Sequence, residues 1–338
     1  MNRARAMNCR SSLAARILAL AAAFLLVASA TPSLAQALAS WNDGPAKRAI
    51  VRFVADVTTV GAPTFVAPGE RIAVFDNDGT LWPEQPLPVQ AVFALDRVKA
   101  LAPQHPEWKE QEPFKSILGG DLEHALAGGE QAVAKLLVAT HAGMTTTEFE
   151  AQVREWIATA RNPRFKRPYT ELAYQPMLEV LRFLREHGFR TYIVSGGGVE
   201  FMRPWAQAVY GVPPEQVIGS QGKLRFEMRE GKPVLVKLPD VDLVDNKAGK
   251  PVGIQKHIGR RPLAAFGNSD GDLEMLQWTT SAPGRRLALL VHHTDAEREF
   301  AYGGSGFAAL GKALDEAAAK GWIVVDMKRD WKRVFAFE

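Results

Sequence analysis

The stretch RIAVFDNDGTLW, residues 71–82, decides the fold of this chain. Its residues 72–75 form a short apolar run of the kind found in parallel strands that are covered on both faces. Two acids, Asp76 and Asp78, follow the run, and Gly79 then allows a sharp turn of the backbone. Carboxylates at such a turn can attack an electrophile, hold a metal ion or transfer a proton. Ordinary turns have the same composition, so the interpretation needs support from the rest of the chain.

The N-terminus accounts for the basic composition. The 338-residue chain has a formal net charge of +4 and a pI of about 9.1, which alone would suggest an acidic polymer as partner. Residues 1–37 contain four arginines, no acid, an apolar run over residues 17–30 and small residues suited to cleavage. This order predicts a secretory signal peptide at residues 1–37. Without it, 37 basic residues balance 37 acidic ones, so we expect no nucleic-acid partner.

The signal peptide predicts export, either to the periplasm or out of the cell, with no stable membrane association after cleavage. An uncleaved membrane anchor is the alternative, because residues 13–30 are nearly long enough to span a bilayer. The only cysteine, Cys9, precedes the apolar run, so the mature chain would have no disulfide. The sequence does not set an oligomeric state.

A helical insertion interrupts the α/β pattern after the opening strand. Prolines follow Trp82 and lead the chain out of the sheet. Thr145 and Glu148 fit a capping box ahead of an amphipathic helix. We expect helices at residues 46–60, 89–101, 122–141 and 145–161. The predicted domains are a core of residues 38–85 and 170–338 and a helical cap of residues 86–169.

Strands and helices alternate again after residue 170. Further strands are expected at residues 191–194, 216–219, 263–266 and 287–291, with a small β-hairpin at residues 221–239 and an edge strand at residues 322–326. Helices are expected at residues 176–187, 199–210, 251–258, 294–300 and 307–319. The pattern predicts a Rossmann-like parallel sheet with helices on both faces.

Three of the expected strands end in small, polar loops that contain glycine. These loops are FDNDGT from Phe75, SGGG from Ser195 and GNSDGD from Gly267. Carboxyl ends of parallel strands lie at one edge of a sheet, so the loops should meet there. Their carboxylates, hydroxyl and backbone donors suit magnesium together with phosphate. Lys250 would balance the charge, and Lys247 is the alternative lysine.

The ordered loops resemble the motifs of the haloacid dehalogenase superfamily, and within it the phosphatases that are similar to phosphoserine phosphatase. FDNDGT resembles the first motif, VSGG the second, Lys250 the third and GNSDGD the fourth. The resemblance extends over about residues 70–292, and the helical insertion resembles the cap that the family places between its first two motifs.

This resemblance implies a magnesium-dependent phosphatase that acts on a small phosphorylated substrate through an aspartyl-phosphate. Asp76 would be the nucleophile, and Asp78 would protonate the leaving oxygen and then activate water. The phosphate would be bound by Ser195, Gly196 and Lys250. Magnesium would be held by Asp76, Asp78, Asn268 and Asp272.

The fourth motif departs from the family pattern at Asn268, where many members have aspartate. Either Asn268 binds the metal more weakly, or Asp272 carries more of the interaction; Asp270 is a third candidate. Asp78 argues against a dehalogenase, which lacks this second acid. A phosphotransferase or phosphomutase, and a non-enzymic protein that binds phosphate or magnesium, are the alternatives.

Other polar residues have a structural interpretation. Glu84 lies near the position at which phosphoserine phosphatases carry an acid that reads the substrate amine, but we interpret it as an exposed turn acid. Trp82 beside it fits the core. Surface, capping or strand-end positions are expected for His141, Arg203, His292 and His293.

Overall fold

The computed structural model describes residues 38–121, 124–125, 130–304 and 308–338. The predicted signal peptide lies outside these described residues. No helix within the described ranges has both the length and the apolar character that crossing a membrane requires.

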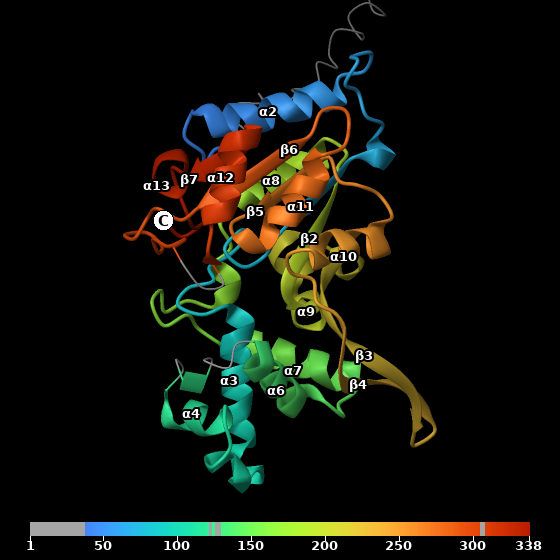
Figure 1. The fold of residues 1–338 in the computed structure, drawn as a ribbon, viewed down its shortest axis with the longest axis vertical. Helices are drawn as coiled ribbons and strands as arrows, with labels where there is room; N and C mark the ends of the chain where they lie inside the picture. The colour runs from blue at the N-terminus through green and yellow to red at the C-terminus, as the bar shows by residue number, and fades with distance from the viewer. Residues whose placement is uncertain (1–37, 122–123, 126–129, 305–307) are drawn as a thin grey trace, which may run out of the picture. The chain divides into compact units, whose positions relative to one another are not determined.

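A seven-stranded sheet forms the centre of the fold, in the order β4-β3-β2-β1-β5-β6-β7 (Figure 1). All neighbouring strands run parallel except β3 and β4. The central strand is β1 (Ile72–Phe75), between β2 (Arg190–Gly198) and β5 (Ala264–Gly267). The outer strands are β3 (Val217–Arg229), β4 (Lys232–Leu243), β6 (Leu287–His292) and β7 (Ile323–Asp326). The predicted parallel α/β sheet is therefore confirmed.

Helices cover both faces of this sheet. On one face, Val74, Val194 and Leu290 belong to a buried cluster with residues of α10, α11 and α12. On the other face, α8 contacts β2 and α2 contacts β7. Because both faces are covered, all four residues of β1 are buried, which explains its uninterrupted apolar run. These helices are α2 (Pro45–Thr58), α8 (Gln175–Glu186), α10 (Gly249–Ile258), α11 (Leu273–Thr280) and α12 (Gly311–Lys320), and α9 (Val199–Tyr210) follows β2.

The insertion after β1 is helical, as predicted, and its helices lie together in Figure 1. It contains α3 (Val89–Leu101), α4 (Phe114–Gly119), α6 (Glu130–His141) and α7 (Thr146–Thr159). The capping box at α7 is present, since the Thr145 hydroxyl accepts from the Glu148 N–H and the Glu148 carboxylate accepts from the Thr145 N–H. The short helix α4 was not predicted, and part of the helix expected at residues 122–141 lies outside the described residues.

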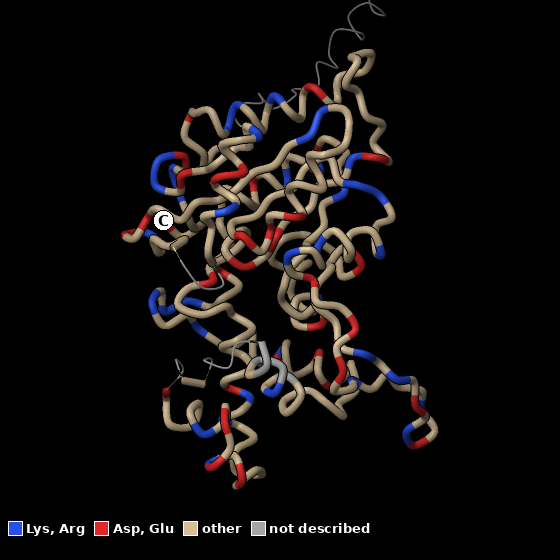
Figure 2. Tube along the Cα trace, viewed as in Figure 1, with Lys and Arg blue, Asp and Glu red and all other residues tan. Residues whose placement is uncertain are grey.

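The hairpin of β3 and β4 is longer than expected. The strand predicted at residues 216–219 and the first arm of the hairpin form one continuous strand, β3, with register shifts near Gly222. Its turn has positive φ at Glu230 and Gly231. The Lys237 N–H donates to the Met144 carbonyl at 2.9 Å, which fastens β4 to the segment between α6 and α7. Lys and Arg are mixed with Asp and Glu over the sheet, the hairpin and the inserted helices (Figure 2).

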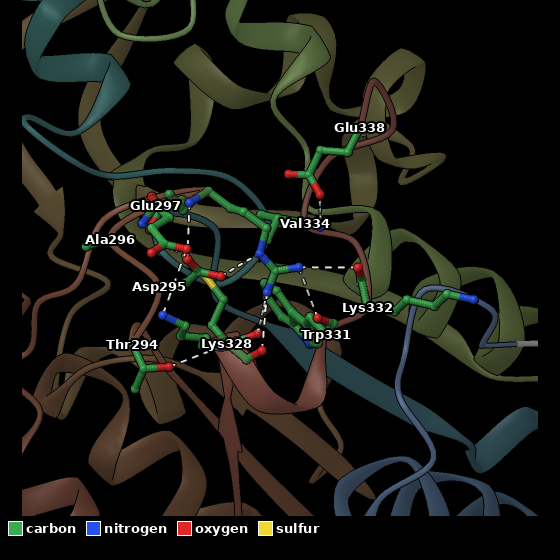
Figure 3. Close-up of polar contacts among 12 residues, drawn as sticks. Thr294, Asp295, Ala296, Glu297, Lys328, Trp331, Lys332, Val334 and Glu338 are labelled. Carbon is green, nitrogen blue, oxygen red and sulfur yellow. Dashed lines mark hydrogen bonds and ion pairs between the residues drawn. The ribbon is translucent and has the colours of Figure 1, made fainter.

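The helix predicted at residues 294–300 is wrong, because this segment is a loop. The Asp295 carboxylate accepts from the N–H groups of Glu297 and Arg298, and these local bonds replace helical ones. The Arg298 guanidinium pairs with Asp295 and donates to the carbonyls of Trp331 and Lys332. Figure 3 shows these contacts between the loop and the C-terminal tail. The last predicted helix begins at Gly311 rather than at residue 307, which is not among the described residues.

We expect Arg298→Ala to lower the free energy of unfolding by about 3 kcal/mol, because it leaves the buried Asp295 carboxylate without its charged partner. Lys328→Ala is the matched control, since Lys328 forms only an exposed ion pair and should cost less than about 1 kcal/mol. Urea unfolding monitored by tryptophan fluorescence measures both. Equal losses in the two variants would contradict the role given to Arg298.

Asp245, just after β4, is fully buried, and neither of its carboxylate oxygens has a hydrogen-bond partner among the described residues. Its N–H donates to the Ser220 hydroxyl at 3.0 Å. Gly253 of α10 lies against it, because a Cβ on this glycine would stand 2.2 Å from the carboxylate. Burial raises the pKa of Asp245 to about 7, although Lys250 acts in the opposite direction.

We expect Asp245→Asn to reduce the loss of stability between pH 5 and 8. A raised pKa means that the folded chain holds its proton more tightly than the unfolded chain, whose pKa is near 3.8. The loss of unfolding free energy caused by Asp245 is therefore absent below about pH 4 and grows as the pH rises to about 7. Above that pH it reaches roughly 4 kcal/mol. Thermal unfolding of both proteins at pH 5 and pH 8 measures the difference. A parallel pH dependence in the two proteins would refute the assignment.

Candidate active site

The three polar loops meet at the carboxyl edge of the sheet. Asp76 directly follows β1, and its N–H donates to the Phe266 carbonyl of β5 at 2.9 Å. Asp78 lies two residues further along the same loop, and Gly197 of the glycine loop would bring a Cβ within 3.6 Å of its carboxylate. Side chains from loops that lie far apart in the sequence are thus brought together, as the strand order requires.

Lys250 joins the loops through one ammonium group. Its Nζ donates to Asp76 at 2.6 Å, to Asp272 at 2.5 Å and to the Val194 carbonyl at 2.9 Å. The lysine lies in the first turn of α10 and is 2 % exposed. Lys247, the alternative lysine, is exposed. The structure therefore places Lys250, and not Lys247, against the predicted nucleophile.

The buried charges change one another's protonation. Burial raises the pKa of Asp76, and the Asp272 carboxylate raises it further, while Lys250 opposes both. Burial on its own would lower the pKa of Lys250, but the carboxylates of Asp272 and Asp76 reverse this and raise it. Lys250 is therefore a fixed positive charge. The protonation of the Asp76 carboxylate depends on the cations that lie close to it.

Asp78 has a defined orientation. Its Oδ1 accepts from the indole N–H of Trp82 at 2.8 Å. Burial raises the pKa of Asp78, and the bond from Trp82 partly offsets this effect. Trp82 is fully buried and stacks on Trp205 of α9, in agreement with the prediction that it belongs to the core. A carboxyl group with a raised pKa in a fixed orientation is suited to donating and accepting a proton.

Residues 195–198, expected as a loop after the strand, form the last part of β2 with a shift of register, and this glycine segment presents Ser195 and Gly196 to the site. Ser195 is buried, and its hydroxyl accepts from the Gly197 N–H at 3.1 Å. Gly196 is exposed. Gln90, in the first turn of α3, reaches the same loop and accepts from the Gly198 N–H at 2.6 Å. One side chain of the insertion thus contacts the predicted phosphate-binding loop.

Asn268 lies beside the acidic loop and is paired with Glu84. Its Nδ2 donates to the Glu84 carboxylate at 2.7 Å, and its Oδ1 accepts from the Thr80 hydroxyl at 3.0 Å. Gly79 has φ +77°, and a Cβ there would stand 2.1 Å from Asn268 and 2.5 Å from Glu84. Only glycine fits this position.

Glu84 is buried, so its interpretation as an exposed turn acid is wrong. The sequence offered no sign of the partner that buries it, because Asn268 lies in a different loop. Burial raises its pKa well above the usual range, and the nearby Asp78 and Asp76 add to the effect.

Asp272 and Asp270 have other partners. Asp272 Oδ1 accepts from Lys250, and its Oδ2 accepts from the N–H groups of Asn268 and Ser269. Asp270 accepts from the Ala313 N–H at 2.8 Å and thus contacts the start of α12. Both carboxylates brace the fourth motif in the structure as it stands.

Among the described residues, the site holds more buried acidic groups than cations. Burial raises the pKa of Asp76, Asp78 and Glu84, and Lys250 is hydrogen-bonded to Asp76 and Asp272. Such an excess of buried negative charge is stabilised by a bound cation or by protonation. Oxygen ligands from Asp76, Asp78 and Asn268 are of the type that Mg²⁺ takes. In the described ranges, no group of three or more His, Cys, Asp or Glu side chains is arranged to hold a metal ion as the structure stands.

Several candidate residues lie elsewhere. Arg203 donates to the carbonyls of Pro214 and Val217, which gives it a structural role. His141 is buried against Phe93 and Phe149, so the prediction of a capping or surface residue is wrong for its environment. Burial lowers its pKa to about 3.

Two contributors to the site were missed from the sequence. Gln90 lies in an ordinary helical pattern that gave no sign of a contact with Gly198. Asn246 lies between two motifs, with its side chain 3.7 Å from a Cβ built on Gly196 and 2.7 Å from one built on Gly271. Its position four residues before Lys250 in the sequence was the available signal.

The arrangement supports nucleophilic chemistry at phosphorus. Asp76 offers a carboxylate at the end of a buried strand, Lys250 holds it in place, and Asp78 can handle a proton nearby. The glycine loop provides a hydroxyl and backbone N–H groups for an anion.

Solved structures with low sequence identity resemble this chain, and one of them has a TM-score above 0.5. A conserved protein of unknown function from Anaerococcus prevotii DSM 20548 is 17% identical, with a TM-score of 0.52, over 83% of this chain and 91% of that one. A protein of unknown function from Bordetella pertussis Tohama I is 19% identical, with a TM-score of 0.48, over 76% and 99%. A phosphoserine phosphohydrolase-like protein from Francisella tularensis subsp. tularensis SCHU S4 is 15% identical, with a TM-score of 0.35, over 65% and 87%.

No curated protein matches the chain. A family model does match, over residues 73–277, and its description is haloacid dehalogenase-like hydrolase. The match begins within β1 and ends in α11, so it includes all four motif regions. The chain belongs to the haloacid dehalogenase-like hydrolase family.

Proposed function

We propose that the protein is a magnesium-dependent phosphatase that hydrolyses small phosphate monoesters through an aspartyl-phosphate on Asp76. The observation that carries this proposal is the contact of Lys250 with both Asp76 and Asp272, which assembles a nucleophile and a fixed positive charge at one point. Phosphoryl transfer depends mainly on positioning and charge stabilisation, and this geometry supplies both.

In the first step, a carboxylate oxygen of Asp76 attacks phosphorus, and the bond from phosphorus to the ester oxygen breaks. Asp78 gives its proton to the departing oxygen, so that an alcohol leaves. Lys250 neutralises phosphoryl oxygens, and Ser195 and the Gly196 N–H bind them. These roles agree with the raised pKa of Asp78, which keeps a proton available.

In the second step, Asp78 takes a proton from water, and the water oxygen attacks phosphorus. The bond from phosphorus to Asp76 breaks, which releases inorganic phosphate and restores the carboxylate. Asp76, the backbone carbonyl of Asp78 and Asn268 would hold Mg²⁺, which when bound offsets negative charge on the phosphoryl group. Glu84 would add a negative charge next to Asn268, which has none.

Two observations favour a small phosphate ester as substrate over a haloacid or a long polyanion. Asp78 supplies the second acid that a leaving alcohol needs and a leaving halide does not. The mixed charges in Figure 2 suit a small substrate better than a long polyanion. A phosphotransferase would use the same residues and would pass the phosphoryl group to an acceptor other than water.

We expect the purified chain without residues 1–37 to release inorganic phosphate from a panel of phosphate monoesters, and to lose activity in EDTA and regain it with Mg²⁺. Asp76→Asn should lower kcat by at least about 1,000-fold, because the nucleophile is removed. Phosphate release measured with a colorimetric assay checks both effects. Activity that survives Asp76→Asn would exclude the mechanism.

Three further tests examine the role of Lys250 and distinguish a phosphatase from a phosphotransferase and a dehalogenase. Lys247→Ala should retain activity while Lys250→Ala loses it, because only Lys250 contacts Asp76. Adding glycerol or another alcohol as acceptor distinguishes a phosphotransferase, since its product would be a new phosphate ester. Release of halide from haloacids without release of phosphate would support a dehalogenase instead.

We also propose that the protein is exported and that its N-terminal 37 residues are removed, on the strength of their charge and hydropathy pattern. Fractionation of expressing cells followed by mass spectrometry of the intact protein tests this. A cytoplasmic, full-length product would refute it, and a membrane-bound full-length product would support an anchor.

A further inference from the structure

His293 is a buried histidine that reaches the acidic loop from behind. It directly follows β6 and is 2 % exposed. Its Nε2 lies 2.7 Å from the carbonyl oxygen of Gly79, and its Nδ1 lies 3.0 Å from Glu299. His292, its neighbour, is only partly buried. The two strand-end histidines, which the sequence could not distinguish, therefore differ in burial.

The hydrogen bonds determine which ring nitrogen donates to the loop. A backbone carbonyl can only accept, so Nε2 must carry a hydrogen that it donates to Gly79. Glu299 Oε1 accepts from the Tyr174 hydroxyl at 3.1 Å, and its Oε2 accepts from the Phe300 N–H at 2.7 Å. Wherever the proton between Nδ1 and Glu299 resides, Glu299 orients the ring so that Nε2 faces Gly79.

Gly79 directly follows Asp78 and lies in the same turn. The Gly79 N–H, which belongs to the same peptide unit as the Asp78 carbonyl, donates to the Trp82 carbonyl at 2.8 Å. Asn268 and Glu84 leave no room for a side chain on Gly79, because a Cβ there would stand 2.1 Å and 2.5 Å from them. A hydrogen bond to the Gly79 carbonyl fixes the peptide unit between Gly79 and Thr80, which directly follows the peptide unit that contains the Asp78 carbonyl.

We propose that His293 is a positioning residue, which holds the Gly79 carbonyl through Nε2 and thereby sets the place of Asp78. The role of Asp78 rests on the proposed phosphatase function, whereas the hold on the loop does not depend on it. His293 acts through Gly79, because the hydrogen bonds of its ring go to Gly79 and Glu299 and not to Asp76.

The surrounding structure keeps the histidine in place. Its ring stacks on Tyr302 at a centroid distance of 4.2 Å. Tyr174 also donates its N–H to the Leu81 carbonyl at 2.8 Å, so it contacts both the loop and Glu299. Arg298, next to Glu299, is bound to the C-terminal tail as described for Figure 3.

Two amide substitutions separate the two ends of the ring. In His293→Gln the amide nitrogen can occupy the place of Nε2 and donate to Gly79, but the bond to Glu299 is lost. In His293→Asn the amide nitrogen can occupy the place of Nδ1 and donate to Glu299, but the bond to Gly79 is lost. Both variants remove a similar part of the buried ring, so each is the other's control.

We expect His293→Asn to lower kcat about 100-fold with little change in KM, because a small displacement of a catalytic group has an effect of this size. His293→Gln should stay within about tenfold of the unsubstituted protein. Hydrogen–deuterium exchange should be faster over residues 76–82 in His293→Asn than in His293→Gln. The opposite order in both measurements, or equal loss in both variants, would overturn the proposal.

The exchange measurement keeps the inference independent of the proposed function. If the unsubstituted protein hydrolyses no phosphate ester, faster exchange over residues 76–82 in His293→Asn alone still supports the hold on the loop. If His293→Asn does not fold, Tyr174→Phe replaces it, since it removes only the hydroxyl that donates to Glu299. Tyr174→Phe should then raise exchange over residues 76–82, and unchanged exchange would overturn the proposal.

Discussion

The three contacts of the Lys250 ammonium group are the interaction on which the rest of the site depends. One nitrogen binds the carboxylate after β1, the carbonyl of Val194 within β2 and the carboxylate of Asp272 after β5. A buried ion pair is costly to desolvate and is weak evidence for stability. Its importance here is geometric, because one ammonium group that binds three acceptors keeps three segments of the chain close together. Asp272 serves this arrangement by occupying its second oxygen with backbone donors.

A second layer of contacts fixes the loop that follows β1. Gly79 lies between Asn268 and Glu84 on one side, and its carbonyl is bound by His293 on the other. Trp82 returns to bind Asp78 and is itself buried against Trp205. The residues behind the loop include Tyr174 and Glu299, which are both fully buried. A catalytic loop held in this way needs little reorganisation when a substrate binds, which is the condition for electrostatic catalysis.

Local patterns in the sequence were reliable where a residue's environment is set by its neighbours in the chain. The apolar run of β1, the capping box of α7 and a hairpin within residues 221–239 all formed as expected. The helix at residues 294–300 failed, because the Asp295 side chain bonds to the backbone N–H groups that a helix would have used, and Arg298 turns to the C-terminal tail. The contacts of Arg298 with the tail depend on partners that are distant in sequence, which no local pattern could indicate.

The sequence by itself determined the α/β fold, the family and the placement of Asp76, Asp78 and Ser195 at one edge of the sheet. These follow from hydrophobic periodicity and from motifs at strand ends, which are local properties. Only the tertiary structure decided that Lys250 rather than Lys247 meets Asp76, that Glu84 is buried on Asn268, and that His293 reaches Gly79. Each of these is a contact between segments far apart in the chain, and its existence depends on how strands and helices pack rather than on any pattern within one segment.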